Sequence, residues 1–200
     1  MNPAMHAYER LSLQQTGVLL GVLLVVMHAL MLLRPAACQG FLRSFPRHQR
    51  LGQMLLGLGF FWFWLLIAPV GQGSWSALAM DLKEFNGMKP MLRLLMPLLF
   101  AAVAYSIREF LAVRALGFLG LLAAHPLLAA AFLKEPSTRL LIPLWTYAMI
   151  IAALFFVGMP YVFRDLVSWA TARSARWTIL AVGGLVYGVA VLSCALLLWK

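Results

Sequence analysis

Acidic side chains are scarce in this chain, and none lies in the middle of a hydrophobic segment. The six are Glu9, Asp81, Glu84, Glu109, Glu135 and Asp165, each near a basic residue at the end of such a segment. Ion-coupled transporters and proton relays place ionisable groups inside the bilayer. The distribution therefore argues against a carboxylate proton relay and against a carboxylate-bound metal centre, and we predict no metal site.

Cysteine is also sparse, and the chain lacks motifs of known intramembrane enzymes. Cys38 and Cys194 are far apart in the sequence and form no paired-cysteine metal motif. Glu109 lacks the adjacent second glutamate of membrane proteases that use a paired-glutamate motif. We therefore predict no catalytic residue and favour a protein that is not an enzyme.

Charged residues make up only 11% of the chain, whereas hydrophobic residues make up 64% and the mean hydropathy is +0.90. Soluble domains carry roughly 25% charged residues. A water-soluble fold could not bury this much apolar surface. The composition predicts an all-α integral membrane protein in which residues 1–200 form a single transmembrane domain.

Six segments are long and apolar enough, or nearly so, to cross ~30 Å of hydrocarbon at about 1.5 Å of rise per residue. They are residues 16–33, 51–70, 90–107, 115–133, 140–163 and 178–199. The third is the weakest, because Arg93 lies inside it, so the helix must be short or Arg93 must reach outward to the interface. The first is longer than a signal-peptide core and is followed directly by Arg34, so we interpret it as a span. The sequence predicts a bundle of six transmembrane helices.

The basic residues predict the orientation of the bundle. Nine of the sixteen fall in the first, third and fifth joints between the spans, with the densest cluster between Arg34 and Arg50. Because positively charged loops are retained in the cytoplasm, we expect both termini on the non-cytoplasmic side of a bacterial inner membrane. The net charge of +10 is spread over segment ends, which favours contact with anionic lipids and disfavours nucleic acid as a partner.

A short amphipathic helix is predicted over residues 74–85, between the second and third spans. Trp75, Leu78, Leu82 and Phe85 recur at steps of three and four. A helix of this length reaches only about 18 Å, so we expect it to lie in the outer headgroup layer. The stretch 164–177 has a similar mixed composition and is expected to extend the fifth span along the inner surface.

Charged residues on the inner side are candidates for contact with a lipid or a partner protein. These are Arg34, Arg43, Arg47, Arg50, Arg108, Glu109 and Arg114. The fork of a guanidinium group suits a lipid phosphate or a partner's carboxylate. The alternative is that these residues only set the topology and solvate the ends of the helices.

Two histidines, His28 and His125, lie within predicted spans. Imidazole is a common haem ligand, so the pair could hold a haem between two helices. The alternative is a neutral histidine bonded within the bundle. Measured from the nearest inner arginine, the two differ by about 7 Å in depth, which disfavours a haem pair, and we expect no cofactor.

Two pairs of glycines, Gly17 with Gly21 and Gly184 with Gly188, each lie four residues apart on the first and last spans. This spacing flattens one face of a helix and lets another backbone approach closely. The face could bind a partner protein or a second copy of the chain, or could pack within one bundle.

These features favour a non-catalytic multi-pass membrane protein, a subunit or scaffold of a membrane complex that contacts lipids and other membrane subunits or copies of itself. One alternative is a small-solute transporter or channel, because Pro97, Pro126, Pro143 and Pro160 would kink the spans. A second is a haem-binding electron-transfer subunit that uses His28 and His125.

Overall fold

The computed structural model describes residues 11–69, 79–80, 82–106 and 109–199, and in this part of the chain every regular element is a helix. The elements, with short 3-10 turns marked η, are α1 (Leu13–Leu33), α2 (Pro35–Ser44), η2 (Phe45–Arg47), α3 (Gln49–Leu66), η4 (Lys83–Met88), α4 (Lys89–Ser106), α5 (Leu111–Ala131), η5 (Ser137–Leu140), α6 (Leu141–Gly158), α7 (Tyr161–Thr171) and α8 (Ser174–Leu197). The predicted all-α class is therefore confirmed for the described residues.

Local sequence signals set the ends of α1. Its first turn begins with a capping box, in which the Gln15 amide donates to Ser12 Oγ at 3.0 Å and the Ser12 amide donates to Gln15 Oε1 at 3.4 Å. Arg34 leaves the helical conformation because it precedes Pro35. Pro35 then begins α2 at a position where a helix needs no N–H donor.

Among the described residues, five helical segments are long and apolar enough to cross a membrane. They are Leu13–Leu33, Glu84–Ser106, Leu111–Ala131, Ser137–Gly158 and Ser174–Leu197. The predicted second span, 51–70, corresponds to α3, which is shorter and carries Gln49, Arg50 and Gln53 in its first two turns. These polar residues lower the hydropathy of α3, and α3 is not among the five segments. The structure supports a multi-pass membrane protein, but it does not confirm the count of six spans.

The predicted amphipathic helix over residues 74–85 is also not confirmed. Ser74–Leu78 and Asp81 lie outside the described residues, whereas Ala79, Met80 and Leu82 are not helical and η4 begins at Lys83. Hydrogen bonds hold Met80 against the end of α3. Its amide donates to Leu66 O at 2.8 Å, and its carbonyl accepts from Lys89 Nζ. A backbone bonded in this way cannot also form the repeating bonds of an α-helix.

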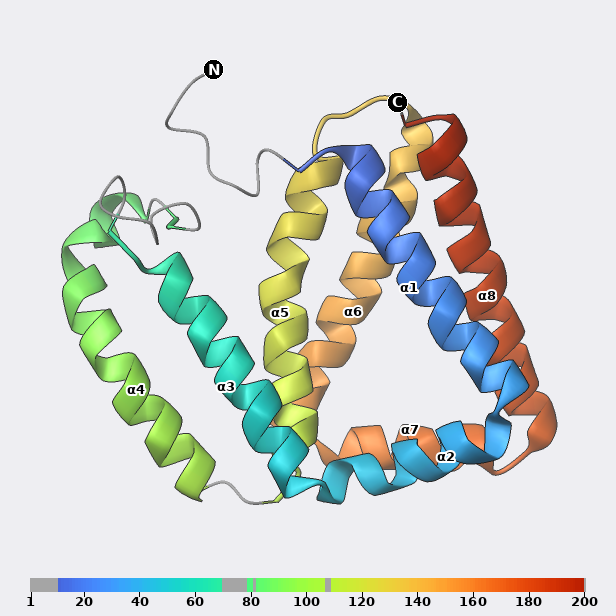
Figure 1. The fold of residues 1–200 in the computed structure, drawn as a ribbon, viewed down its shortest axis with the longest axis horizontal. Coiled ribbons are helices and arrows are strands. Elements are labelled where there is room, and N and C mark those ends of the chain that lie inside the picture. The colour runs from blue at the N-terminus through green and yellow to red at the C-terminus, as the bar shows by residue number, and fades with distance from the viewer. Residues whose placement is uncertain (1–10, 70–78, 81, 107–108, 200) are drawn as a thin grey trace.

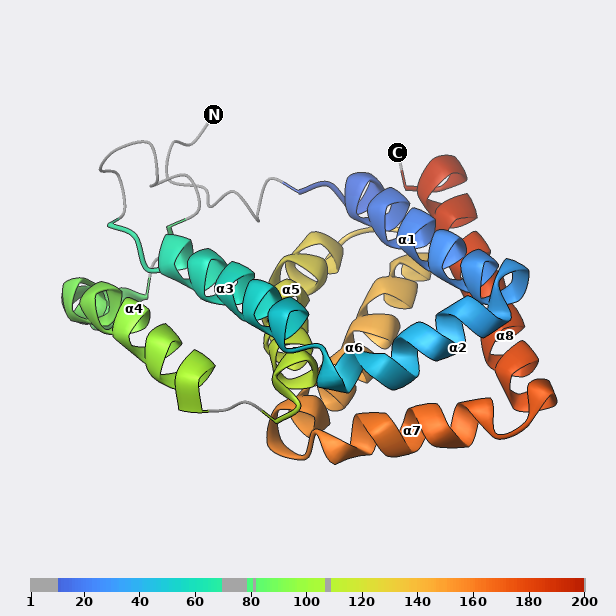
Figure 2. The same ribbon diagram turned by 60° about the horizontal axis from the view of Figure 1, so that its bottom comes forward.

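The helices are arranged as three pairs side by side, α4 with α3, α5 with α6, and α1 with α8 (Figure 1). α2 and α7 run next to each other across one end of the bundle, as both ribbon views show (Figures 1 and 2). The predicted fifth span, 140–163, ends at Gly158, and after Pro160 the chain turns into α7. α7 is thus a separate helix along the end of the bundle rather than a continuation of α6.

Indole and phenol groups of α8 and the residue pair that follows it join this helix to its neighbours. Trp177 Nε1 donates to Met31 O at 3.0 Å, near the end of α1. The Tyr187 hydroxyl donates to the Leu141 carbonyl of α6. Trp199 Nε1 donates to Thr138 Oγ1 at 2.9 Å in η5. Each of these bonds pairs a polar group that lipid could not satisfy.

Candidate functional sites

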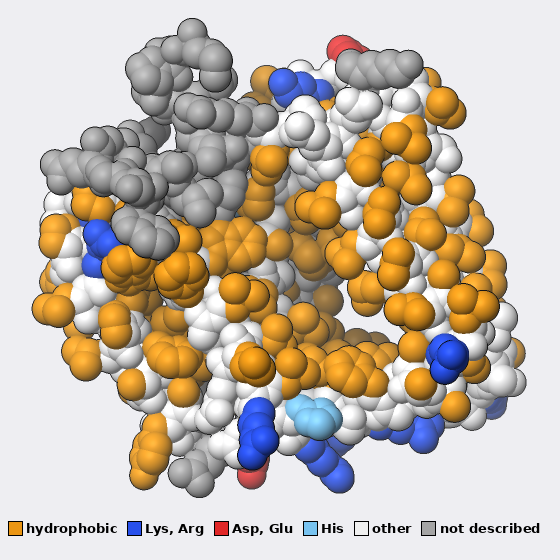
Figure 3. Space-filling model, viewed as in Figure 1, with side chains coloured by type: hydrophobic (Ala, Val, Ile, Leu, Met, Phe, Trp, Pro, Cys, Tyr) orange, Lys and Arg blue, Asp and Glu red, His pale blue; other side chains and the backbone are white. Residues whose placement is uncertain are grey.

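A cavity of about 260 Å³ lies at the end of the bundle where α2 and α7 run. Its lining consists of Arg43, Pro46, Arg47, Glu109, Phe110 and Arg164. Three cationic side chains thus surround one carboxylate, and we call this cavity the basic pocket. In the space-filling view, Lys and Arg side chains gather at this end, whereas apolar side chains cover the flanks of the bundle (Figure 3).

Contacts between distant segments of the chain build the basic pocket. Arg43 Nε of α2 donates to Thr171 Oγ1 of α7 at 3.3 Å, which ties the two end-lying helices together. On the α5 side, Phe110 takes a left-handed conformation with φ of 56°, and its carbonyl accepts the first amides of α5. A non-glycine residue adopts this conformation only where its surroundings hold it. Buried Phe45 and Phe163, whose ring centroids are 5.5 Å apart, pack beneath it.

The charges of the basic pocket are only partly compensated. Arg164 pairs with Asp165 at 2.9 Å, but both side chains are more than half exposed. Such exposed pairs contribute about 0–1 kcal/mol, so an incoming anion can compete with Asp165. Guanidinium groups donate two parallel hydrogen bonds to a phosphate or carboxylate. The chemistry of the pocket is therefore that of an anion site at the end of a membrane bundle.

Only some of the charged residues that we selected from the sequence line the basic pocket. Arg43, Arg47 and Glu109 meet in the basic pocket, together with Arg164, which sequence reasoning did not select. Arg34 and Arg50 are exposed outside the pocket lining, and Arg114 is half-buried in α5, where its Nε makes no hydrogen bond with a described residue. Arg108 lies outside the described residues.

The four predicted glycines lie in the interface between α1 and α8, where each one faces residues of the opposite segment. A Cβ atom at Gly17 would lie 2.3 Å from the Trp199 ring, and one at Gly21 would lie 2.9 Å from the Leu192 amide nitrogen. A Cβ atom at Gly188 would lie 2.9 Å from the Val25 amide nitrogen. The closeness of the two backbones therefore depends on glycine. This is packing within one chain.

The two histidines are not brought together. A Cβ atom at Gly184 would lie 2.0 Å from His28 Nε2, and His28 Nδ1 is 2.7 Å from Leu24 O in its own helix. Gly184 thus makes room for the His28 ring, while His125 is exposed on α5. His28 is five residues from the end of α1 and His125 is fourteen from the start of α5. Both helix ends lie at the α2–α7 end, so the rings differ by about 13 Å in depth.

No group of three or more His, Cys, Asp or Glu side chains with metal-binding geometry occurs in the described residues. Cys38 and Cys194 are both free thiols and half-buried.

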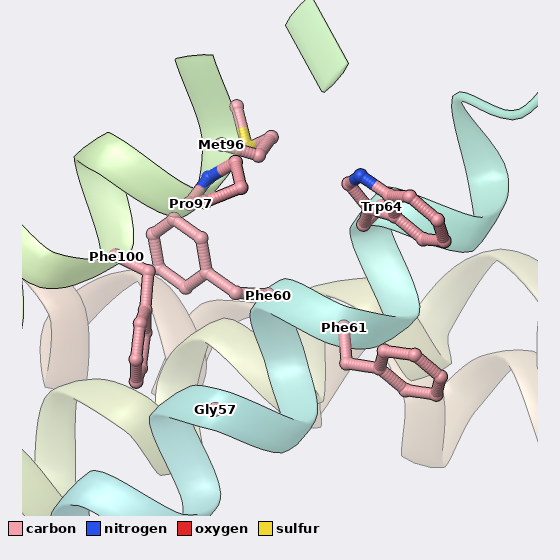
Figure 4. A pocket seen from close by; sticks show the side chains of 7 residues that line it. All are labelled: Gly57, Phe60, Phe61, Trp64, Met96, Pro97 and Phe100. Carbon is pink, nitrogen blue, oxygen red and sulfur yellow. The ribbon is translucent and has the colours of Figure 1, made fainter. Parts of the chain in front are cut away.

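An apolar groove of about 300 Å³ runs between α3 and α4 (Figure 4). It is lined by Gly57, Phe60, Phe61, Trp64, Met96, Pro97 and Phe100. The Phe60 and Phe100 rings meet across it with centroids 5.6 Å apart. Arg93, one turn before Pro97, places its Cζ 4.0 Å from the centroid of the Trp64 ring. A charged group therefore stands beside one wall of a hydrocarbon-lined groove.

A second apolar cavity, of about 600 Å³, lies between α1, α3, α5 and α6, and the surface between α1 and α5 is hollowed (Figure 3). Leucine, tryptophan and methionine side chains make up most of its lining. Gln15 and Thr16 are polar members, and Thr16 Oγ1 is buried with no hydrogen-bond partner among the described residues. A lining of this kind suits hydrocarbon better than a hydrated ion.

No protein-family model, curated protein or solved structure matches the chain.

Proposed function

We propose that the protein is a non-catalytic multi-pass membrane protein, a subunit or scaffold of a membrane complex, whose basic end binds anionic lipid. In this proposal α3 forms a sixth span, residues 74–85 lie in the outer headgroup layer, and both termini lie on the non-cytoplasmic side of a bacterial inner membrane. The observation that supports it best is the convergence of Arg43, Arg47 and Arg164 in one pocket between α2, η2 and α7.

The position of the basic pocket supports a lipid headgroup as its ligand. Its arginines belong to α2, η2 and α7. Because α2 and α7 run across the end of the bundle (Figure 2), these residues lie where spanning helices end. Each basic residue near an anionic membrane surface contributes about 1 kcal/mol to the attraction. Three arginines less one glutamate correspond to about 2 kcal/mol, or roughly 30-fold preference for an anionic over a zwitterionic headgroup.

The exposure of α4 supports a role within a complex. Only 6% of the Glu84–Ser106 segment is buried inside the chain, against 17% to 33% for the other four spanning segments. α4 packs mainly on α3 and leaves Leu94, Leu98 and Tyr105 exposed. This face is open to a helix of another subunit.

Lipid retention tests the first part of the proposal. Native mass spectrometry of the detergent-purified full chain would count bound phosphatidylglycerol and phosphatidylcholine. We expect the Arg43→Gln/Arg47→Gln variant to lose about 30-fold in phosphatidylglycerol affinity, because it removes two of the three pocket cations. The matched control is Arg34→Gln/Arg173→Gln, which removes the same charge at exposed positions outside the pocket lining.

Equal losses in the two double variants would mean that total charge, rather than the pocket, attracts lipid. Copurification in mild detergent tests the second part of the proposal. A subunit or scaffold should retain specific membrane proteins, and a chain that purifies with lipid alone would contradict that role.

A further inference from the structure

We infer that the groove between α3 and α4 is a separate lipid site, which takes one acyl chain of an anionic phospholipid and holds its phosphate on Arg93. The groove lies away from the basic pocket, because Arg93 is in the second turn of α4 and the basic pocket lies beyond the other end of that helix. The site therefore serves the leaflet opposite to that of the basic pocket.

Arg93 needs an anion because of its position within a spanning segment. It is nine residues into the Glu84–Ser106 span. A charged side chain inside a spanning segment is costly unless it is paired, and the cation–π contact with Trp64 offsets only part of that cost. Arg93 Nε is buried and makes no hydrogen bond with any described residue. A lipid phosphate would supply the missing partner.

The contact of Arg93 with Trp64 holds the guanidinium group beside the groove. The Arg93 Cζ atom lies over the Trp64 ring, 4.0 Å from its centroid. A guanidinium group carries five N–H donors in a rigid fork that matches a phosphate. Phe61 lies nearly parallel to Trp64, at 13° and 6.4 Å between centroids, and packs beside this indole. The aromatic pair thus holds the cation of Arg93 next to the groove, where a guanidinium group can bind an anion.

Pro97 adds a second polar group at the same height. Proline has no N–H, so the carbonyl of Arg93 lacks the donor that residue i+4 normally supplies in a helix. A hydroxyl group on a lipid headgroup can donate to this carbonyl. Phosphatidylglycerol carries both the phosphate and such hydroxyls.

The groove continues from Arg93 in the direction that an acyl chain takes. Met96, Pro97 and Phe100 follow Arg93 by three to seven residues, which is about 4–10 Å deeper along α4. The lining side chains are apolar except for the indole N–H of Trp64 (Figure 4), and the volume of about 300 Å³ lies at the lower end of the range for ligand pockets. The site therefore places a cation for the headgroup first and an apolar lining for the acyl chain deeper along α4, which is the order of these groups in a phospholipid.

Two substitutions separate the phosphate contact from the chain contact. Arg93→Gln removes the cation and leaves the groove intact. Gly57→Leu fills the groove, because a Cβ atom at Gly57 would lie 3.7 Å from the Phe100 ring, an ordinary contact that requires no backbone shift. The matched controls are Gly183→Leu, where a Cβ atom would meet nothing within 4 Å, and Arg139→Gln in η5.

The experiment uses phosphatidylglycerol with a photoreactive group on one acyl chain, and phosphatidylcholine with the same chain, in nanodiscs of the full-length protein. Crosslinks are mapped by mass spectrometry in the Arg43→Gln/Arg47→Gln background, so that the basic pocket does not contribute. We expect crosslinks at residues 96–100 to be about tenfold stronger with phosphatidylglycerol, corresponding to ~1.4 kcal/mol. Arg93→Gln should abolish this preference, and Gly57→Leu should remove the crosslinks of both probes.

Thermal unfolding of each variant shows whether it is folded, and Arg93→Lys, which keeps the charge but not the planar fork, should retain part of the preference. Equal crosslinking of the two lipids in the parent chain, or unchanged crosslinks in both variants and controls, would overturn the proposal. An acidic protein that copurifies with the parent chain but not with Arg93→Gln would replace the lipid by a protein partner. Because the basic pocket is already disabled, failure here leaves the proposed function untouched.

Discussion

Adding one methyl group at Gly188 tests whether the close approach of α1 and α8 stabilises the bundle. In Gly188→Ala the new Cβ atom would lie 2.8 Å from Leu24 Cβ and 2.9 Å from the Val25 amide nitrogen. Ordinary contacts are about 3.5–4.0 Å, so α1 must move by roughly 0.7–1 Å. Because backbone rather than a flexible side chain blocks the methyl group, we expect the usual cost of overpacking, about 1–3 kcal/mol.

A matched glycine isolates this cost from helix propensity. Alanine is about 0.8–1 kcal/mol more favourable than glycine inside a helix. Gly188→Ala therefore gains stability from helix propensity while it loses stability from the steric clash with α1. Gly183→Ala, five residues earlier on α8, gains the same propensity, but its Cβ atom meets nothing within 4 Å. The difference in unfolding free energy between the two variants should therefore equal the steric term of about 1–3 kcal/mol. Reversible unfolding in mixed micelles with increasing dodecyl sulfate, followed by circular dichroism, measures it.

The neighbouring contact at Gly21 provides a further check. Its Cβ atom would lie 2.9 Å from the Leu192 amide nitrogen, across the same interface. Once one methyl group has separated the helices, a second one costs less, so Gly21→Ala/Gly188→Ala should lose less stability than the sum of the single variants. If Gly188→Ala is as stable as Gly183→Ala, the interface is not sterically limited and the reasoning fails.

Three further predictions address other parts of the molecule. In a cysteine-free background in intact cells, a membrane-impermeant thiol reagent should label a cysteine at Asn2 and not one at Gln49; the reverse pattern would invert the orientation. Lys89→Met should lower the unfolding free energy by about 1–3 kcal/mol in the dodecyl sulfate assay, because the carbonyls of Ala68 and Met80 lose their ammonium donor. Unchanged stability would show that water replaces the ammonium group. Thr138→Val should lose about 1 kcal/mol by removing the acceptor of Trp199 Nε1, and an equally stable variant would contradict that role.

The spanning helices could be predicted from the sequence because their ends carry strong local signals. The first predicted span, 16–33, corresponds to α1, which stops where Arg34 meets Pro35. The last, 178–199, corresponds to α8, which begins four residues earlier, at Ser174. Hydropathy could not decide the status of α3, because its first two turns carry Gln49, Arg50 and Gln53 while the rest of the helix is apolar and aromatic.

The mixed composition of residues 164–177 predicts a surface-lying segment that overlaps α7, but α2 and the full basic pocket could not be predicted in the same way. α2 is ten residues long and of mixed composition, so its sequence was consistent with a simple joint between spans. Arg43, Arg47 and Glu109 were candidates because of their charge and predicted side of the membrane. Arg164 joins them only because α7 turns away from α6 and docks beside α2, a non-local contact that no sequence periodicity indicates.

The pairing of α1 with α8 has a consequence for the order in which the protein acquires its structure. Among the helices that the structure describes, α1 is synthesised first, yet α8, which covers its glycine face, is synthesised last. The partner residues are separated by most of the chain, and contacts of such long sequence separation form late because their loop-closure entropy must be overcome first. During insertion, the glycine face of α1 therefore has no partner helix until α8 enters the membrane. A chain interrupted before α8 would leave the glycine face of α1 open to non-native partners. Membrane chaperones and proteases would therefore distinguish this incomplete chain from the complete one.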